Sequence, residues 1–425
     1  MALGMTMAEK ILANHSGKTQ VKAGEYVTAR IDQVCVHDTF PEIEHEMISE
    51  GIAEGLTMVW DKARVVALMD HASPAMDKNV SIAETHVFIR NLVKKAGITN
   101  FYDVKAGICH QFMIDKGFVL PGSLVLATDS HSTIYGALNC GGTGIGITEM
   151  AWVLHFGELW FMVPPTIKLE VTGDLPKGVM SKDIFLSLSG NYGVDFAQYK
   201  SLEWAGSGVE NMSLDGRICL ANQSVELGAK FSLFEADEKT MAFVQNRAVR
   251  EFEAISPDAD AAYEAVINID AAELTPLVAQ PHGMEVVNPA SCYSDVKIDQ
   301  AIIGGCSNGR LEDLQIAAQV FKGKKVHPDV RCIVGAASWE IYKDAMRLGY
   351  FETIIDAGAI ICHSHCGPCV GNMGALAPGE VAITATSRNF KGRMGSPEAF
   401  IYLASPATVA ASAIAGHVID PREAL

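Results

Sequence analysis

The stretch AIIGGCSNGRLEDLQIAAQVFKG, residues 301–323, contains the pattern that decides the fold. Its first part, AIIGG at 301–305, is short and apolar, as is typical of a buried strand. Its last part, at 311–323, has apolar residues at helical spacing. The glycine-flanked segment between them places Cys306 in a turn that leads into the helix. The stretch therefore predicts a strand–turn–helix unit with a thiol at its turn.

The same alternation recurs along the chain. Other strand-like runs lie at 63–69 (ARVVALM), 122–128 (GSLVLAT) and 330–337 (VRCIVGAA), and each is followed by loop residues. Helical periodicity also appears at 81–97 (SIAETHVFIRNLVKKAG). Alternating strands and helices of this kind predict an α/β protein.

Two breaks divide the chain, the first with paired prolines and the second rich in proline and glycine. They are VPPT, where paired prolines stop a helical run, and QPHGMEVVNP. They predict three α/β domains, at 1–164, 165–281 and 282–425. The middle domain has strand patterns of its own and is therefore expected to contain a separate sheet.

Size and charge limit the classes of function. The chain has 425 residues, of which 49% are hydrophobic, so it has ample material for a core. A net charge of −17 without a long basic run disfavours nucleic acid and anionic membranes as partners. The sequence shows no secretory signal and no apolar run of membrane-spanning length. Because its ten cysteines are scattered, unlike those of disulfide-rich secreted domains, we expect a cytoplasmic protein with reduced thiols.

A second cysteine motif, CHSHCGPC at 362–369, has several interpretations. Its C-G-P-C is compatible with a redox dithiol, its mixed cysteines and histidines with zinc, and the motif alone with a purely structural role. Cys366 and Cys369 could also join Cys306 in holding a cubane iron–sulfur cluster. Electron-transfer clusters usually have four cysteine ligands, whereas an open metal position permits Lewis-acid chemistry. The common fate of a lone cysteine such as Cys306 is a buried core thiol.

Histidines and carboxylates near strand ends form another group of candidates. Asp70 and His71 follow the run at 63–69, and an adjacent carboxylate raises the basicity of an imidazole and fixes its tautomer. Asp129, Ser130 and His131 follow the run at 122–128 in the same way. Each histidine alone is more often a satisfied structural residue, but their number at strand ends favours acid–base chemistry.

Three further features complete the set of candidates. The glycine-rich CGGTGIG at 140–146 is predicted to be a loop, and GICHQF contributes His110. Asn222 and Glu226 are four residues apart, so on a helix they would share one face, either solvated or partly buried. The segment SRNFKGR at 387–393 contains cations without an acid, in a chain that is acidic overall.

The motifs D-H, D-S-H, G-x-C-x-N, C-G-P-C and R-N-F-x-G-R, in this order, resemble the aconitase superfamily. The likeness extends over essentially the whole chain. Length and ending are similar to the large subunits of the isopropylmalate dehydratase and homoaconitase group. The resemblance implies three α/β domains around a central iron–sulfur cluster, without the swivelling fourth domain of single-chain aconitases.

The resemblance also implies a cofactor and a reaction. Cys306, Cys366 and Cys369 match the three cysteines that hold a [4Fe-4S] cluster in the family, with one iron left without a protein ligand. Cys362 and the two neighbouring histidines are then outside the ligand set. The implied enzyme is a hydro-lyase that isomerises a 2-hydroxy diacid by removing water and adding it back at the neighbouring carbon.

The resemblance further implies roles for the other candidates. The catalytic set comprises Asp70, His71, His110, Asp129, His131 and Glu226. The substrate-binding set comprises Ser130, Asn222, Arg388 and Arg393. In the first set, Asp70 and His71 would protonate the departing hydroxyl, and His110 would pair with Asp129. His131 and Glu226 would handle the iron-bound water, while the arginines would bind carboxylate through bidentate contacts.

A catalytic base is expected from a partner. In single-chain aconitases this base is a serine of the swivelling domain, and the present sequence ends at Leu425 without such a domain. We therefore expect a small subunit that carries the swivelling domain, in a heterodimer or heterotetramer.

The chain departs from the family pattern at Ser387, at 37–41 and at 220–223, where substrate or cluster contacts are expected. Large subunits acting on homocitrate, methylmalate or 2,3-dimethylmalate are therefore alternatives to an isopropylmalate enzyme. Alternatives of another class are an iron–sulfur electron-transfer protein, which should show a fourth cysteine ligand, and a regulatory RNA-binding protein, which the acidic charge disfavours.

Overall fold

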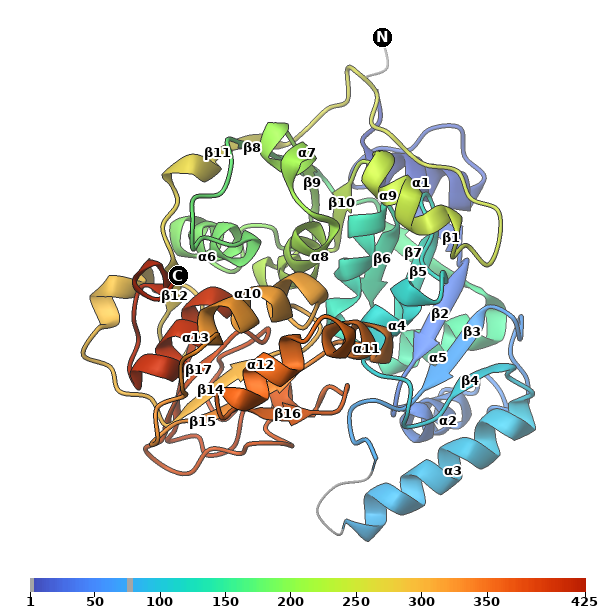
Figure 1. Cartoon of the computed structure of the whole chain (residues 1–425). Coiled ribbons are helices and arrows are strands. Elements are labelled where there is room, and N and C mark those ends of the chain that lie inside the picture. The colour runs from blue at the N-terminus through green and yellow to red at the C-terminus, as the bar shows by residue number, and fades with distance from the viewer. Residues whose placement is uncertain (1–3, 75–78) are drawn as a thin grey trace. The chain divides into compact units, whose positions relative to one another are not determined.

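A computed structural model describes residues 4–74 and 79–425, which alternate between strands and helices (Figure 1). The predicted α/β class is confirmed. The chain forms two compact units, each made of three segments. Unit 1 comprises Met1–Glu170, Ala197–Gly206 and Ser224–Ile269. Unit 2 comprises Val171–Phe196, Ser207–Gln223 and Asp270–Leu425. The division into three domains at 164 and 281 stays a prediction.

The centre of unit 1 is a five-stranded sheet in which all neighbouring strands are parallel. The strands follow the order β4 (Asn100–Tyr102), β3 (Val65–Leu68), β2 (Gln33–Val36), β5 (Leu124–Ala127) and β6 (Gly141–Gly144). Every residue of β2, β3 and β5 is buried, as expected for a parallel sheet covered on both faces. Residues that follow these strands therefore emerge at one edge of the sheet.

Two smaller sheets lie mainly in unit 1. One is the antiparallel pair β1 (Tyr26–Arg30) and β7 (Glu158–Met162). The other has the order β10 (Phe231–Phe234), β9 (Ser201–Ala205), β8 (Thr166–Thr172) and β11 (Ala265–Asp270). The helices of this unit are α1 (Met7–Ser16), α2 (Phe40–Ser49), α3 (Val80–Ala96), α4 (Cys109–Asp115), α5 (Ile147–Phe156), α9 (Glu238–Gln245), and the 3₁₀ helices η1 (Ser130–Leu138) and η2 (Ser224–Leu227).

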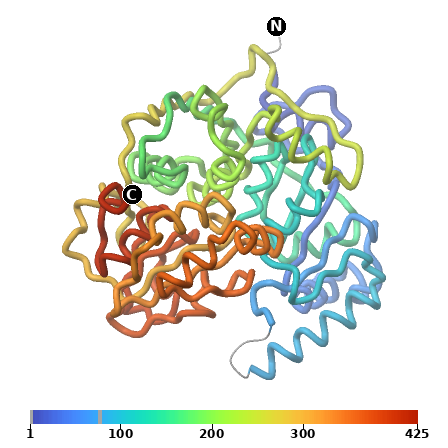
Figure 2. Tube along the Cα trace, viewed as in Figure 1, coloured from blue at the N-terminus to red at the C-terminus, as the bar shows by residue number. Residues whose placement is uncertain are grey.

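Unit 2 is built on a seven-stranded sheet. Its order is β13 (Val287–Pro289), β12 (Leu277–Ala279), β18 (Phe400–Ala404), β17 (Val381–Thr384), β14 (Gln300–Ile303), β15 (Arg331–Gly335) and β16 (Ile360–Cys362). The five strands from β18 to β16 are parallel, whereas β12 runs antiparallel to its neighbours. Figure 2 shows the red C-terminal segment running among the orange elements of this unit.

Unit 2 contains both α-helices and short 3₁₀ helices. They are α6 (Ser181–Tyr192), α7 (Ser207–Asn211), α8 (Leu214–Gln223), α10 (Leu311–Phe321), α11 (Trp339–Arg347), α12 (Tyr350–Asp356), α13 (Pro406–Ala415), and the 3₁₀ helices η3 (Ala271–Glu273), η4 (Ala290–Tyr293), η5 (Gly367–Val370) and η6 (Pro421–Glu423). Leu314 and Phe321 of α10 share one apolar core with Val334 and Val409. The predicted strand–turn–helix unit at 301–323 is thus confirmed as β14 followed by α10.

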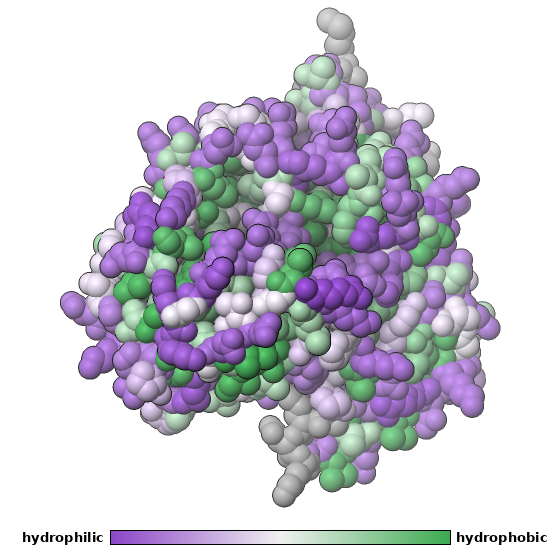
Figure 3. All heavy atoms as spheres, in the orientation of Figure 1, coloured by the Kyte–Doolittle hydropathy of each residue, from purple (hydrophilic) through white to green (hydrophobic). Residues whose placement is uncertain are grey.

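Two properties of the described residues bear on the environment of the protein. Hydrophilic side chains cover most of the face seen in Figure 3, with small apolar groups between them. Among residues 4–74 and 79–425, the structure contains no helix with the length and apolar character needed to span a bilayer.

The prediction of a loop at the glycine-rich segment 140–146 is wrong, because residues 141–144 form strand β6. Helix η1 runs so close to this strand that side chains would not fit. A Cβ atom on Gly142 would lie 2.4 Å from the carbonyl oxygen of Ser132, and one on Gly144 would lie 2.6 Å from that of Asp129. The glycines therefore allow η1, which begins after Asp129, to pack directly on the sheet.

Candidate active site

Three neighbouring strands of unit 1 each lead into titratable residues. His37 follows β2, Asp70 and His71 follow β3, and Asp129 follows β5. Because β3, β2 and β5 are adjacent and parallel, these side chains meet at the carboxyl edge of the sheet, where open α/β sheets commonly bind ligands. The structure thus brings the D-H and D-S-H motifs together.

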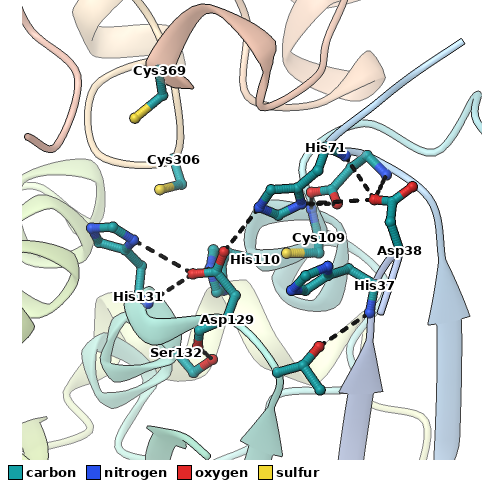
Figure 4. Close-up of polar contacts among 12 residues, drawn as sticks. His37, Asp38, His71, Cys109, His110, Asp129, His131, Ser132, Cys306 and Cys369 are labelled. Atoms are coloured by element: carbon teal, nitrogen blue, oxygen red, sulfur yellow. Dashed lines mark hydrogen bonds and ion pairs between the residues drawn. The ribbon is translucent and has the colours of Figure 1, made fainter. Parts of the chain in front are cut away.

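Asp129 is the centre of a hydrogen-bond network (Figure 4). Its Oδ1 accepts from Nε2 of His110 at 2.9 Å and from the backbone N–H of His131 at 2.8 Å, while its Oδ2 lies 3.1 Å from Nε2 of His71. Burial raises the pKa of Asp129, but the charge and hydrogen bond of His110 and the hydrogen bonds from His131 and His71 together hold this pKa well below its usual range. Asp129 is therefore an ionised carboxylate at neutral pH.

His71 lies between two carboxylates. Its Nδ1 is 2.7 Å from Oδ1 of Asp70, and its Nε2 faces Asp129. Burial raises the pKa of Asp70, but the charge and hydrogen bond of His71 outweigh it and lower the pKa to about 2. Since an ionised carboxylate only accepts hydrogen bonds, both ring nitrogens of His71 carry protons in this arrangement. His71 is thus placed as an imidazolium, which can act as a proton donor.

His131 and Glu226 form a second buried pair. Nε2 of His131, near the start of η1, lies 3.1 Å from Oε1 of Glu226 in η2. Ser130, between Asp129 and His131, is half-buried. Asn222 lies near the end of α8, which stops at Gln223, so the predicted helical face shared by Asn222 and Glu226 is wrong. The 3₁₀ turn at Glu226 has about three residues per turn, which changes the direction of its side chains.

Sequence reasoning assigned no role to three members of this network. Oδ2 of Asp38 accepts the backbone N–H groups of Asp70 and His71 at 3.1 and 2.9 Å. Its Oδ1 lies 3.6 Å from Nε2 of the buried His86. The ring of His37 stacks on that of His71 with centroids 4.3 Å apart, and burial lowers the pKa of His37. The run VCV followed by His-Asp repeats the strand-end pattern of the other motifs and was a usable signal.

Acidification is expected to destabilise the protein through Asp70. The folded-state pKa of about 2 lies below the ordinary value of 3.8, so the stabilisation is complete above pH 3.8 and is lost as the pH falls towards 2. The difference corresponds to about 2 kcal/mol of unfolding free energy. Chemical denaturation of wild type and Asp70→Asn should show that the advantage of the wild type shrinks between pH 6 and pH 3. An advantage that stays constant over this range would contradict the proposed ion pair.

Unit 2 carries the three candidate cluster thiols on loops that follow its parallel strands. Cys306 follows β14, Cys366 follows β16, and Cys369 lies in η5. Because β14 and β16 flank β15 in parallel, both loops leave the same edge of the sheet. All three thiols are buried and none forms a disulfide. Figure 4 includes the side chains of Cys306 and Cys369.

Two neighbours of these thiols have other environments. Cys362 belongs to an apolar cluster with Ile302 and Ile333, and burial raises the pKa of its thiol to about 12. It is therefore a protonated core thiol. Nδ1 of His365 accepts the backbone N–H of Gly367 at 3.0 Å, which fixes the turn between Cys366 and Cys369.

The donor groups of unit 2 fit an iron–sulfur cluster. Nη2 of Arg393 donates to Sγ of Cys369 at 3.3 Å, and Oγ of Ser387 lies 3.7 Å from Sγ of Cys306; contacts of these kinds stabilise thiolates. Nδ2 of the buried Asn222 has no hydrogen-bond partner among the described residues, so a sulfide or substrate oxygen would satisfy it. Arg388 is half-buried on the loop that carries Arg393.

Comparisons with known proteins support the motif analysis. The family model "Aconitase family (aconitate hydratase)" matches residues 9–291 and 284–416. The 3-isopropylmalate dehydratase large subunit 1 of Methanopyrus kandleri is 46% identical and covers 99% of both chains. The 3-isopropylmalate dehydratase large subunit of Heliobacterium modesticaldum is 45% identical, and the match covers 99% of this chain and 100% of that protein. The probable methanogen homoaconitase large subunit of Methanothermobacter thermautotrophicus is 43% identical, over 99% and 98%.

Proposed function

The chain belongs to the aconitase family, and from this premise we propose that it is the large, cluster-bearing subunit of a hydro-lyase for a 2-hydroxy diacid, most specifically 3-isopropylmalate dehydratase. The observation that carries the proposal is identity of 43–46% over essentially the full length of relatives with that name. These relatives are hydro-lyases of a family whose members hold a [4Fe-4S] cluster. A relative named as a homoaconitase makes homocitrate the leading alternative substrate.

The proposed cofactor is a [4Fe-4S] cluster on Cys306, Cys366 and Cys369, with one iron that has no protein ligand. When bound, it supplies an electrophilic centre that weakens the C–O bond of the substrate. The hydrogen bond from Arg393 to Cys369 and the hydroxyl of Ser387 beside Cys306 support thiolate ligation. In the same proposal, Arg388 and Arg393 bind substrate carboxylate, and Asn222 and Ser130 add neutral hydrogen bonds.

The acid–base residues of unit 1 would move the protons. His71, held as an imidazolium by Asp70 and Asp129, donates a proton to the departing hydroxyl. Asp129 also orients His110, which keeps the carboxylate fixed while His71 changes its protonation state. Nε2 of His131 and Oε1 of Glu226 lie 3.1 Å apart, which places one proton donor and one acceptor for exchange with the leaving water.

The names of the relatives as large subunits imply a small-subunit partner. We propose that this partner carries the swivelling domain and supplies the base that removes the proton next to a carboxylate. A positioned general base typically contributes about 10²–10⁴ in rate. The proposal therefore predicts a large difference between the isolated chain and the complex.

Co-expression with the small subunit should give an active enzyme when both are purified without oxygen. Dehydration is assayed over a panel of isopropylmalate, homocitrate, methylmalate and dimethylmalate. We expect the highest kcat/KM with isopropylmalate, and a rate at least about 100-fold lower for the isolated large subunit. Equal rates for the isolated chain and the pair would contradict the two-subunit proposal. A pair that holds the cluster but converts no diacid would contradict the proposed function.

A further inference from the structure

Lys182 is a completely buried cation in unit 2. It lies in the first turn of α6, and its exposed fraction is 0%. Its ammonium group donates to Oδ1 of Asn308 at 3.2 Å and to the carbonyl oxygens of Ala385 and Thr386 at 2.8 and 2.7 Å. A lysine ammonium has three N–H donors, so these three contacts satisfy it completely.

The three acceptors belong to the two loops that carry the proposed cofactor and substrate contacts. Asn308 lies two residues after Cys306, on the loop that follows β14. Ala385 and Thr386 follow β17 and come directly before Ser387 and Arg388. One ammonium group therefore joins the Cys306 loop to the arginine loop, although Asn308 lies 77 residues before Ala385 and 78 before Thr386 in sequence.

Further hydrogen bonds make the Cys306 loop rigid around this contact. Nδ2 of Asn308 donates to Oδ1 of Asp313 at 2.9 Å, and Oδ2 of Asp313 accepts the backbone N–H of Arg310 at 2.9 Å. Nη1 of Arg310 donates to the carbonyl oxygen of Cys306 at 2.6 Å. Displacement of Lys182 would therefore be transmitted to Cys306 through Asn308.

All three acceptors of Lys182 are neutral oxygens, yet a buried ammonium is costly without compensating negative charge. Burial lowers the pKa of Lys182 to about 8, and the groups that act against this are Cys219, Asp313, Cys369 and Cys306. Two of these four are candidate ligands. Iron-bound thiolates would supply the negative charge that the neutral oxygens do not.

We propose that Lys182 is the buried counter-charge of the iron–sulfur cluster and a positioning residue that holds the Cys306 loop against the arginine loop. The inference rests on the proposed function because it takes the cluster as the cofactor. Lys182 is additional to the proposed ligands and substrate-binding residues, because it contacts neither the thiolates nor the substrate directly. Its effects are expected in cofactor retention and in the reduction potential of the cluster.

The test compares Lys182→Met, which is close in shape but neutral, with Lys182→Gln, which is neutral but keeps side-chain donors. Lys230→Met is the matched control, since Lys230 is a half-buried lysine whose ammonium lies over the Phe161 and Tyr199 rings of unit 1. Full-length proteins are purified without oxygen. Iron and sulfide per chain, the rate of iron loss to a chelator, and the potential of the oxygen-generated three-iron form are measured.

We expect Lys182→Met to lose iron about 10-fold faster than wild type, as is typical when an outer-shell partner of a metal site is removed. Both Lys182 variants should show a lower reduction potential, because a nearby positive charge favours the reduced cluster. Lys182→Gln should retain more iron than Lys182→Met, and Lys230→Met should match wild type in both measurements.

The inference would be overturned if both Lys182 variants lost iron at the wild-type rate and had the wild-type reduction potential. If Lys182→Met does not fold, the potential of Lys182→Gln decides the question. A wild-type protein that holds the cluster but converts no diacid contradicts only the proposed function. A wild-type protein without iron after oxygen-free purification contradicts both.

Discussion

Replacing Cys369 by serine is expected to remove the cluster and the dehydration activity together. A serine hydroxyl is a harder and far less acidic donor than a thiol, and it does not replace a thiolate on iron. Because an electrophilic metal contributes several kcal/mol to the transition state, we expect the rate to fall by at least about 1,000-fold. Iron and sulfide content, the visible absorption of the cluster and the dehydration rate check this expectation.

Cys362→Ser is the matched control, because it makes the same change seven residues away in the same motif. Cys362 lies in an apolar cluster with a raised thiol pKa, so it is expected to bind no iron. The variant should keep its cluster and activity, and should lose about 1–3 kcal/mol of stability from burying a hydroxyl. If both variants lose iron to the same extent, the assignment of the ligands to Cys306, Cys366 and Cys369 is wrong.

Asp129→Asn is expected to lower kcat by about 10³–10⁴ while KM changes little, an effect of the size seen when a buried carboxylate that orients a catalytic imidazole becomes an amide. The amide keeps the shape of the side chain. One of its two oxygen positions, however, becomes an NH₂ group that donates and cannot accept. Since Asp129 accepts from His71, His110 and a backbone N–H, at least one histidine must then turn or lose its proton.

Steady-state kinetics of the complete enzyme with loaded cluster test this prediction, and the iron content of the variant confirms that the cofactor is unchanged. Asp103→Asn provides the control in unit 1, because it removes a carboxylate whose partner is the half-buried Arg90. Asp103 accepts hydrogen bonds from Arg90 and from the backbone N–H of Val104, which are outside the candidate catalytic set, so this variant should keep nearly full activity. An Asp129→Asn enzyme with the kcat of wild type would remove Asp129 from the proposed catalytic set.

The sequence predicted the fold where the apolar pattern is strong and local. The runs ARVVALM, GSLVLAT and VRCIVGAA became β3, β5 and β15, because burial on both faces of a parallel sheet requires continuous apolar residues. Strand β6 was not predicted, because it consists mainly of glycines and has no apolar run. Its glycines are selected by the close approach of η1, which is a tertiary contact that no local pattern reveals.

The candidate site was predictable as a set of residues but not as a network. Strand-end motifs identified Asp70, His71 and Asp129, yet only the parallel order of β3, β2 and β5 shows that Asp129 serves several histidines at once. Asp38 repeated a visible pattern and could have been included. Lys182 had no signal, because a single lysine in an amphipathic helix is normally exposed to solvent.

The interleaving of the two units has a consequence for how the polypeptide matures and how it can be engineered. The backbone crosses from one unit to the other after Glu170, Phe196, Gly206, Gln223 and Ile269. A nascent chain on the ribosome therefore cannot finish the first unit until Ile269 has been added. No single cut in the chain therefore separates the two units. Recombination between two homologues at one breakpoint would combine segments of different parents within one unit and so disturb the packing of its core.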